Sequence, residues 1–185
     1  MEDFFEKLYK YVNKPVRYIG NEVNAIIKKN EDVDLRWVLA YPDIYEIGMS
    51  HTGLKILYHI LNKETNILAE RVFAIQKDLS DLLKKENRRL FSLETRQDVK
   101  GFDVLGITIQ SEVTYTSILH ILEEAGITRY SEDRGEDEPI VIGGGPATYN
   151  PEPIAPFFDV ILIGDGEEAV VEISKVLIDV SITNI

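Results

Sequence analysis

The chain of 185 residues contains no cysteine. It therefore forms no disulfide, carries no thiolate nucleophile, and cannot bind zinc or an iron–sulfur cluster through sulfur. Basic residues are also scarce: 20 Lys and Arg stand against 32 Asp and Glu, for a formal net charge of −12. The negative surface that follows from this balance disfavours binding to nucleic acid and to anionic membranes.

Long apolar runs are absent as well. No stretch of the sequence approaches the ~20 residues of a membrane span. The N-terminal sequence MEDFFEKLYKYVNK mixes acids with lysines and lacks the uninterrupted apolar core of a signal peptide. We therefore predict a cytoplasmic protein without a membrane partner. With 44% hydrophobic residues, the chain can bury a sizeable core within about one domain.

The first 34 residues are expected to differ from the rest. Phe5, Leu8, Tyr9 and Val12 follow helical spacing, so we predict a short amphipathic helix that ends before Pro15. The sequence that follows, RYIGNEVNAIIKKNEDVD, is polar and mixed, which is typical of an extended arm. We assign residues 1–34 to an N-terminal helix and arm, and residues 35–185 to an α/β domain.

From residue 35 onward, short apolar strands alternate with amphipathic helices. This pattern predicts a doubly wound α/β fold, Rossmann-like or flavodoxin-like, with a parallel sheet and helices on both faces. A further short segment, RLFSL, is a candidate for an additional strand. The expected strands of the sheet are LRWVLAY, ILAERVFA, VLGITI, IVIGGG and DVILIG.

Ligands of such sheets bind beyond the carboxyl ends of the strands. Three loops fall there, at residues 42–53, 110–114 and 143–149. Gly143, Gly144 and Gly145 would allow close approach of the backbone to a bulky ligand, or would serve a tight turn. They do not form the GxGxxG pattern that marks a dinucleotide site.

The first loop contains the spacing Asp43-x-Tyr45-x-x-Gly48 and is followed by Ser50 and His51. His51 is a candidate metal ligand or proton donor. Its alternative, which we prefer, is an ordinary place at the start of a helix that Ser50 caps. Asp43, His51 and Glu112 together leave open a third possibility, a metal-dependent or other small-molecule enzyme.

The order of these motifs resembles the N-terminal cobalamin-binding-type domain of radical S-adenosylmethionine (SAM) enzymes. Asp43-x-Tyr45-x-x-Gly48 is similar to the DxHxxG loop of cobalamin domains, in which the histidine is the lower ligand of cobalt. The sequence GGP followed by Thr and Pro, and a GEGE-like turn, match Gly144 to Pro151 and Gly164 to Glu167. The chain looks most like uncharacterised radical SAM proteins that open with RYIGNE and YPDIYEIGMSH.

The resemblance implies cobalamin as a cofactor. Tyrosine at the histidine position implies either that cobalt has no protein lower ligand or that binding has been lost, because a neutral phenol is a poor ligand. The residues implied on the cobalt side are Asp43, Tyr45, Gly48, Ser50 and His51. Those implied for the glycine loop and the nucleotide tail are Thr108, Gln110, Gly143, Gly144, Gly145 and Thr148.

The same resemblance places SAM and a 4Fe-4S cluster outside this chain. That cluster needs a CxxxCxxC motif, so a radical SAM domain would be a partner in cis or in trans, and this chain alone would not be a radical SAM enzyme. The sequence ends soon after the last expected helix, which we expect of a truncated chain or a split gene. The alternative function is a structural module that docks on a radical SAM domain without a cofactor.

Overall fold

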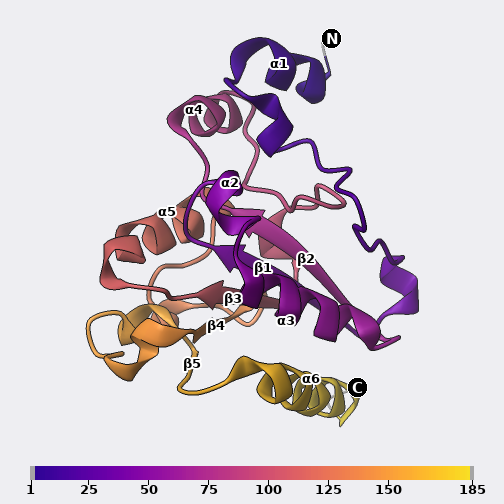
Figure 1. The fold of residues 1–185 in the computed structure, drawn as a ribbon, viewed down its shortest axis with the longest axis vertical. Coiled ribbons are helices and arrows are strands. Elements are labelled where there is room, and N and C mark those ends of the chain that lie inside the picture. The colour runs from indigo at the N-terminus through magenta and orange to yellow at the C-terminus, as the bar shows by residue number, and fades with distance from the viewer. Residues whose placement is uncertain (1–2, 184–185) are drawn as a thin grey trace.

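The computed structural model describes residues 3–183 and contains, over that range, a five-stranded parallel sheet in the order β2-β1-β3-β4-β5 (Figure 1). This order is that of flavodoxin-like folds, and it confirms the predicted doubly wound architecture. The strands are β1 (Leu35–Tyr41), β2 (Ile67–Phe73), β3 (Val104–Thr108), β4 (Ile140–Gly144) and β5 (Val160–Leu162).

Helices cover both faces of the sheet. One face packs against α3 and α6, and the other against α1, α4 and α5. Figure 1 shows α1 beside α4 at the top of the view, and α6 at the bottom. The α-helices are α1 (Phe4–Tyr11), α2 (Tyr45–Gly48), α3 (Thr52–Lys63), α4 (Lys77–Lys85), α5 (Tyr115–Ala125) and α6 (Gly166–Thr183). The short 3₁₀ turns are Pro15–Arg17, Asn30–Asp32, Val99–Gly101, Glu112–Thr114, Ser131–Asp133, Pro146–Tyr149 and Ala155–Phe157.

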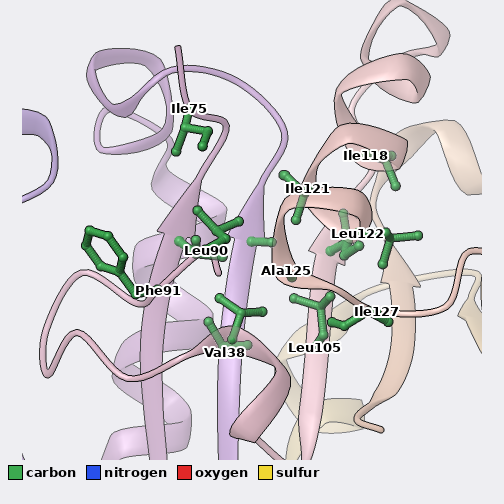
Figure 2. Packing of buried hydrophobic residues seen from close by; sticks show 14 of the residues in the cluster. Val38, Ile75, Leu90, Phe91, Leu105, Ile118, Ile121, Leu122, Ala125 and Ile127 are labelled. Atoms are coloured by element: carbon green, nitrogen blue, oxygen red, sulfur yellow. The ribbon is translucent and has the colours of Figure 1, made fainter. Parts of the chain in front are cut away.

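Alternation along the central strands divides the core into two layers. In β1, Val38 and Ala40 face α4 and α5, whereas Trp37 and Leu39 face α3 and α6. Figure 2 shows Val38 packed together with the other labelled residues of the layer that faces α4 and α5. Each fully buried side chain of this kind contributes about 1.5–3 kcal/mol to folding. Burial on both faces is why the strands read as continuous apolar runs.

Trp37 joins the sheet to the last helix. Its indole lies over Gly106 of β3, where a Cβ would come within 3.1 Å of the ring. The indole N–H donates to Ser174 Oγ of α6 at 3.0 Å, and the Ser174 hydroxyl donates to the Val170 carbonyl at 2.6 Å. Glycine in the middle of β3 therefore makes room for the tryptophan that positions α6.

The segment RLFSL is not a strand of the sheet, so that prediction is wrong. Its pairing is an isolated antiparallel bridge between Phe91 and Asp98. Leu93 N donates to the Arg71 carbonyl of β2 at 2.8 Å, but the next contacts to β2 come from the Glu94 carboxylate, which accepts from Arg71 N at 2.7 Å and Arg71 Nε at 2.6 Å. A side chain replaces the backbone ladder, and the segment covers the edge strand without extending the sheet.

The N-terminal helix buries Phe4 rather than the predicted Phe5 and Tyr9. Phe4, Leu8 and Val12 are buried, while Tyr9 is 59% exposed and Phe5 is half-buried. Phe4 reaches the core because it packs edge-on against Phe91, with ring centroids 5.9 Å apart. The helix joins the α4 layer of the core. The division of the chain at residues 34 and 35 stays a prediction.

The arm that follows lies along α3 and β2. Ile26 N donates to Tyr58 Oη at 2.8 Å. The Lys28 ammonium donates to carbonyls at the C-terminal end of α3 and the start of β2, those of Asn62 at 3.0 Å, Glu64 at 2.5 Å and Ile67. A cation at that place satisfies carbonyls that have no partner within the helix. Within residues 3–183 no helix is long and apolar enough to cross a bilayer.

The acidic loop between α5 and β4 is anchored by one carboxylate. Most of its acids are exposed, but Glu138 accepts hydrogen bonds from Lys100 Nζ at 2.7 Å, Thr128 N at 3.1 Å and Gly135 N at 3.4 Å. Burial would raise the pKa of Glu138, but these hydrogen bonds prevail and lower it to about 2. The folded loop therefore favours the ionised carboxylate.

This carboxylate predicts an acid dependence of stability. Between about pH 5 and pH 2 the unfolded chain binds a proton at Glu138 that the folded chain does not, so the free energy of unfolding falls as the pH is lowered. Glu138→Gln removes the titrating group and should make that fall smaller, measured by urea denaturation across this range. Glu136→Gln, at an exposed neighbour, should leave the fall unchanged. Equal falls in the wild-type chain and in Glu138→Gln would contradict the anchoring role.

Candidate functional site

A cavity of about 360 Å³ lies at the carboxyl edge of the sheet, on the face covered by α3 and α6. Its volume is in the range of small-molecule pockets, about 300–1,000 Å³. Strands β1, β3 and β4 form its floor, and the first turns of α3 and α6 form its sides. The cavity thus occupies the place at which open α/β sheets bind ligands.

The cavity exists because two floor positions are glycine. Gly106 pairs with Ile142, and Thr108 pairs with Gly144, so Gly106 and Gly144 are diagonal neighbours on one face of adjacent strands. The space over Gly106 is partly filled by Trp37 and Leu39. A Cβ built on Gly144 would meet no atom within 4 Å. A gap that side chains would fill elsewhere in the sheet is left open over β4.

Polar side chains line the cavity beside the ends of the strands and the starts of the helices. Thr108 and Gln110 come from the end of β3, and His51 precedes α3. Asp165 and Glu167 stand at the start of α6, after Gly164, whose φ of 129° is one that only glycine adopts readily. Gly164 therefore lets the chain turn directly from β5 into α6 beside the cavity.

His51 is itself the N-cap of α3. Its Nδ1 accepts from Leu54 N at 3.1 Å, and Gln110 Nε2 lies 2.9 Å from its Nε2. Because a neutral ring that accepts at Nδ1 carries its proton on Nε2, two donors would face each other there, and turning the Gln110 amide over lets its oxygen accept the ring proton. Burial lowers the pKa of His51, which favours this neutral form. Both ring nitrogens are engaged.

Ser50 does not cap the helix, so that prediction is wrong. Its hydroxyl donates to the Glu46 carbonyl at 2.7 Å, within the turn that includes α2. His51 takes the cap because its φ and ψ of −74° and 117° are extended, the conformation that lets an N-cap side chain reach back to the helix.

Residues 42–50 of the first loop lie apart from the cavity, whereas His51 and Gly53 line it. The Tyr45 hydroxyl donates to the Glu22 carboxylate of the arm at 2.5 Å, and its ring packs edge-on against Phe73 at 5.7 Å. Burial and the Glu22 carboxylate raise the pKa of Tyr45 to about 12. Gly48 lies against the Phe73 ring, where a Cβ would come within 2.2 Å, and Asp43 Oδ1 accepts from Ile44 N at 2.7 Å. Asp43, Tyr45, Gly48 and Ser50 do not line the cavity.

The glycine loop contributes to the cavity unequally. Gly143 faces the opposite layer, where a Cβ would come within 2.8 Å of Ile109. Gly145 has a φ of 122° and lies against the Ile109 carbonyl. Thr148 is buried, does not line the cavity, and donates its hydroxyl to the Gly145 carbonyl at 2.8 Å. Gly143 and Gly145 shape the loop, and Gly144 is the position that faces open space.

The structure thus separates the predicted site residues into two groups. One group comes together at the cavity: His51, Thr108, Gln110 and the three glycines. The other does not line it: Asp43, Tyr45, Gly48, Ser50 and Thr148. Sequence reasoning missed most of the apolar lining, which could not be told from ordinary core. A glycine inside the apolar run VLGITI was the signal for Gly106. The missed lining residues include Trp37, Leu39, Leu57, Gly106, Ile142, Val170 and Ile173.

The acidic residues of the first loop and of the loop at residues 110–114 do not assemble. Glu46 pairs with Arg17 at 2.8 Å and lies 3.5 Å from Lys14, and Glu112 is exposed on a short 3₁₀ turn. Across residues 3–183, no group of three or more His, Asp or Glu side chains is arranged to hold a metal ion. The metal-dependent enzyme therefore gains no support from the geometry.

Comparison with known proteins points to one family. The family model described as radical SAM proteins, N-terminal, matches residues 53–184. An uncharacterized protein of Methanocaldococcus jannaschii, MJ0966, is 27% identical over 130 residues. That alignment covers 70% of this chain and 23% of the archaeal protein, so the chain spans less than a quarter of the relative it matches.

The cap at His51 predicts a second pH dependence. Since the pKa of His51 is lowered in the folded chain, the unfolded chain binds a proton below about pH 6.5 that the folded chain resists. The free energy of unfolding should therefore fall from pH 7.5 to pH 5.5. His51→Asn keeps a capping side chain and should reduce this fall, measured by urea denaturation at both pH values. His59→Asn, at an exposed histidine of α3, is the matched control and should behave as the wild type. An unchanged fall in His51→Asn would exclude the neutral cap.

Proposed function

We propose that this chain, which belongs to the N-terminal domain family of radical SAM proteins, holds a corrin cofactor for a radical SAM domain. The observation that carries the proposal is the open cavity over Gly144, at the ligand-binding edge of the sheet. In this arrangement the nucleotide tail of cobalamin enters the cavity, and the corrin ring remains outside the edge.

The residues at the cavity fit such a tail. The backbone at Gly144 can approach a flat ring closely, because no Cβ stands between them. Apolar side chains of α3 and α6 would cover the opposite side of the ring and exclude water. Toward the rim, Thr108 and Gln110 offer hydrogen-bonding groups to the polar part of the tail. The role of these residues is to bind the nucleotide tail and to orient it.

The first loop does not fit a protein ligand to cobalt. Tyr45 stands where cobalamin domains carry histidine, and its phenol is held protonated by Glu22 with a pKa of about 12. His51 has both ring nitrogens engaged at the start of α3. We therefore propose that the cobalt is bound without a ligand from this chain. When bound, cobalamin would supply a methyl carrier to the partner domain.

The partner domain supplies the remaining chemistry. Because the chain has no cysteine, a cluster that cleaves SAM must be bound by another domain, in cis or in trans. This chain matches less than a quarter of its archaeal relative, which leaves most of that protein outside the match. We propose that this N-terminal domain presents the corrin and that the radical SAM domain uses it.

A second candidate is a docking module without a cofactor. The Tyr45–Glu22 hydrogen bond favours it, because this bond ties the first loop to the arm. A first loop that no longer binds cobalt is free to make such a contact. The two candidates differ in one measurable property, the binding of a corrin to the isolated chain or to the chain with its radical SAM domain.

The cavity predicts a specific loss of binding. Gly144→Val places a branched side chain in the open space and should weaken cobalamin binding at least tenfold, measured by equilibrium dialysis with hydroxocobalamin. Gly101→Val is the matched control, since Gly101 also has no atom within 4 Å of a built Cβ but lies outside the cavity. It should bind as the wild type does.

Thermal unfolding of both valine variants would establish that each is folded. Equal affinity of Gly144→Val and Gly101→Val would contradict the placement of the tail. Failure of the wild-type chain to bind any corrin, alone and with its radical SAM domain, would favour the docking module.

A further inference from the structure

We infer that the cavity selects a flat, apolar bicyclic base, so that it accepts a corrinoid with a benzimidazole lower base and discriminates against one with a purine. This inference rests on the proposed corrin-binding function and adds a specificity to it. It follows from the polarity of the cavity lining, which differs sharply between its interior and its rim.

Apolar side chains line the cavity from the sheet and from both helices. Trp37, Leu39 and Ile142 belong to the sheet, and Leu57, Val170 and Ile173 come from α3 and α6. Trp37, Leu39, Ile142 and Val170 are buried within the core layer on this face of the sheet. A ligand group that enters this space exchanges water for hydrocarbon and aromatic contacts.

Most polar atoms near the cavity are already paired. The Trp37 indole N–H donates to Ser174 Oγ, and the Ser174 hydroxyl donates to the Val170 carbonyl. The Gly144 carbonyl accepts from Ile109 N at 2.7 Å. The exception on the floor of the cavity is Thr108, which pairs with Gly144 on the same face of the sheet. Beside Gly144 the floor therefore offers a single side-chain hydroxyl among apolar groups.

The shape of the cavity favours a flat ring. Along one side the strands present bare backbone at Gly144 and, next to it, the Trp37 ring that lies over Gly106. The helices present branched aliphatic side chains along the other. A planar group can lie between these surfaces, and a methyl group at its far edge would gain apolar contact.

A purine in the same place would bury an exocyclic amine and several ring nitrogens, more hydrogen-bonding atoms than the single hydroxyl of Thr108 can satisfy. Buried polar groups that lose their hydrogen bonds to water weaken binding strongly, by about tenfold to a hundredfold for one such group. The six-membered ring of dimethylbenzimidazole, in contrast, is hydrocarbon and carries two methyl groups. With either base, the hydroxyls of the attached ribose would reach the rim, where the Asp165 and Glu167 carboxylates can accept hydrogen bonds.

Three corrinoids test this selectivity by equilibrium dialysis: cobalamin, its analogue with adenine as the lower base, and cobinamide, which lacks the nucleotide tail. We expect cobalamin to bind about ten to a hundred times more tightly than the adenine analogue. Cobinamide should also bind more weakly than cobalamin. Equal affinity for cobalamin and the adenine analogue would overturn the inference and leave corrin binding intact. If none of the three binds, the proposed function itself fails.

A change of polarity inside the cavity should change the ratio of affinities. Ile173→Gln places an amide among the lining residues and should lower the preference for cobalamin over the adenine analogue. Val176→Gln, at an exposed position of the same helix, is the matched control and should leave the ratio unchanged. Leu57→Gln tests the same point from α3 if the α6 variant does not fold. An unchanged ratio in both cavity variants would contradict the selectivity.

Discussion

The candidate site depends on a missing side chain at one strand position. Helices pack on a sheet at a distance that side chains normally fill, and interiors reach the density of organic crystals. Gly144 leaves that space open at the carboxyl edge, and Gly106 gives room to the Trp37 ring, whose hydrogen bond to Ser174 ties α6 to the sheet. The cavity, its apolar lining and the direction of α6 all follow from these two glycines.

A second consequence is that the site has an open half and a closed half. Over Gly144 the protein has space lined mostly by apolar groups, which suits a ligand that brings its own apolar surface. At the first loop, Glu22 and Phe73 hold Tyr45 in place, and the phenol stays protonated. A domain of this kind can hold a cofactor by its tail and leave the reactive side to a partner. The lack of cysteine agrees with that division of labour.

The fold could be predicted from periodicity and loop positions, because strands buried on both faces read as unbroken apolar runs, as in LRWVLAY. The prediction of a strand at RLFSL was wrong, because Glu94, the residue that follows it, contacts the edge strand through its carboxylate and not through the backbone. His51 replaced Ser50 as the cap because the choice depends on backbone angles that residue types do not reveal. The glycine loop was predictable in position. The apolar lining was not, because Leu57 and Val170 have the same pattern as core residues until the neighbouring glycine leaves a gap.

The central claim is that the tail of a corrin lies between the glycine strands and the helices α3 and α6. Nuclear Overhauser effects between the protons of the dimethylbenzimidazole of bound cobalamin and the side-chain protons of the chain test it most directly. The account predicts cross-peaks to Leu57 and Val170, on the two helices that enclose the cavity. A complex in which the base instead shows cross-peaks to Tyr45 and Phe73, and none to Leu57 or Val170, would contradict it.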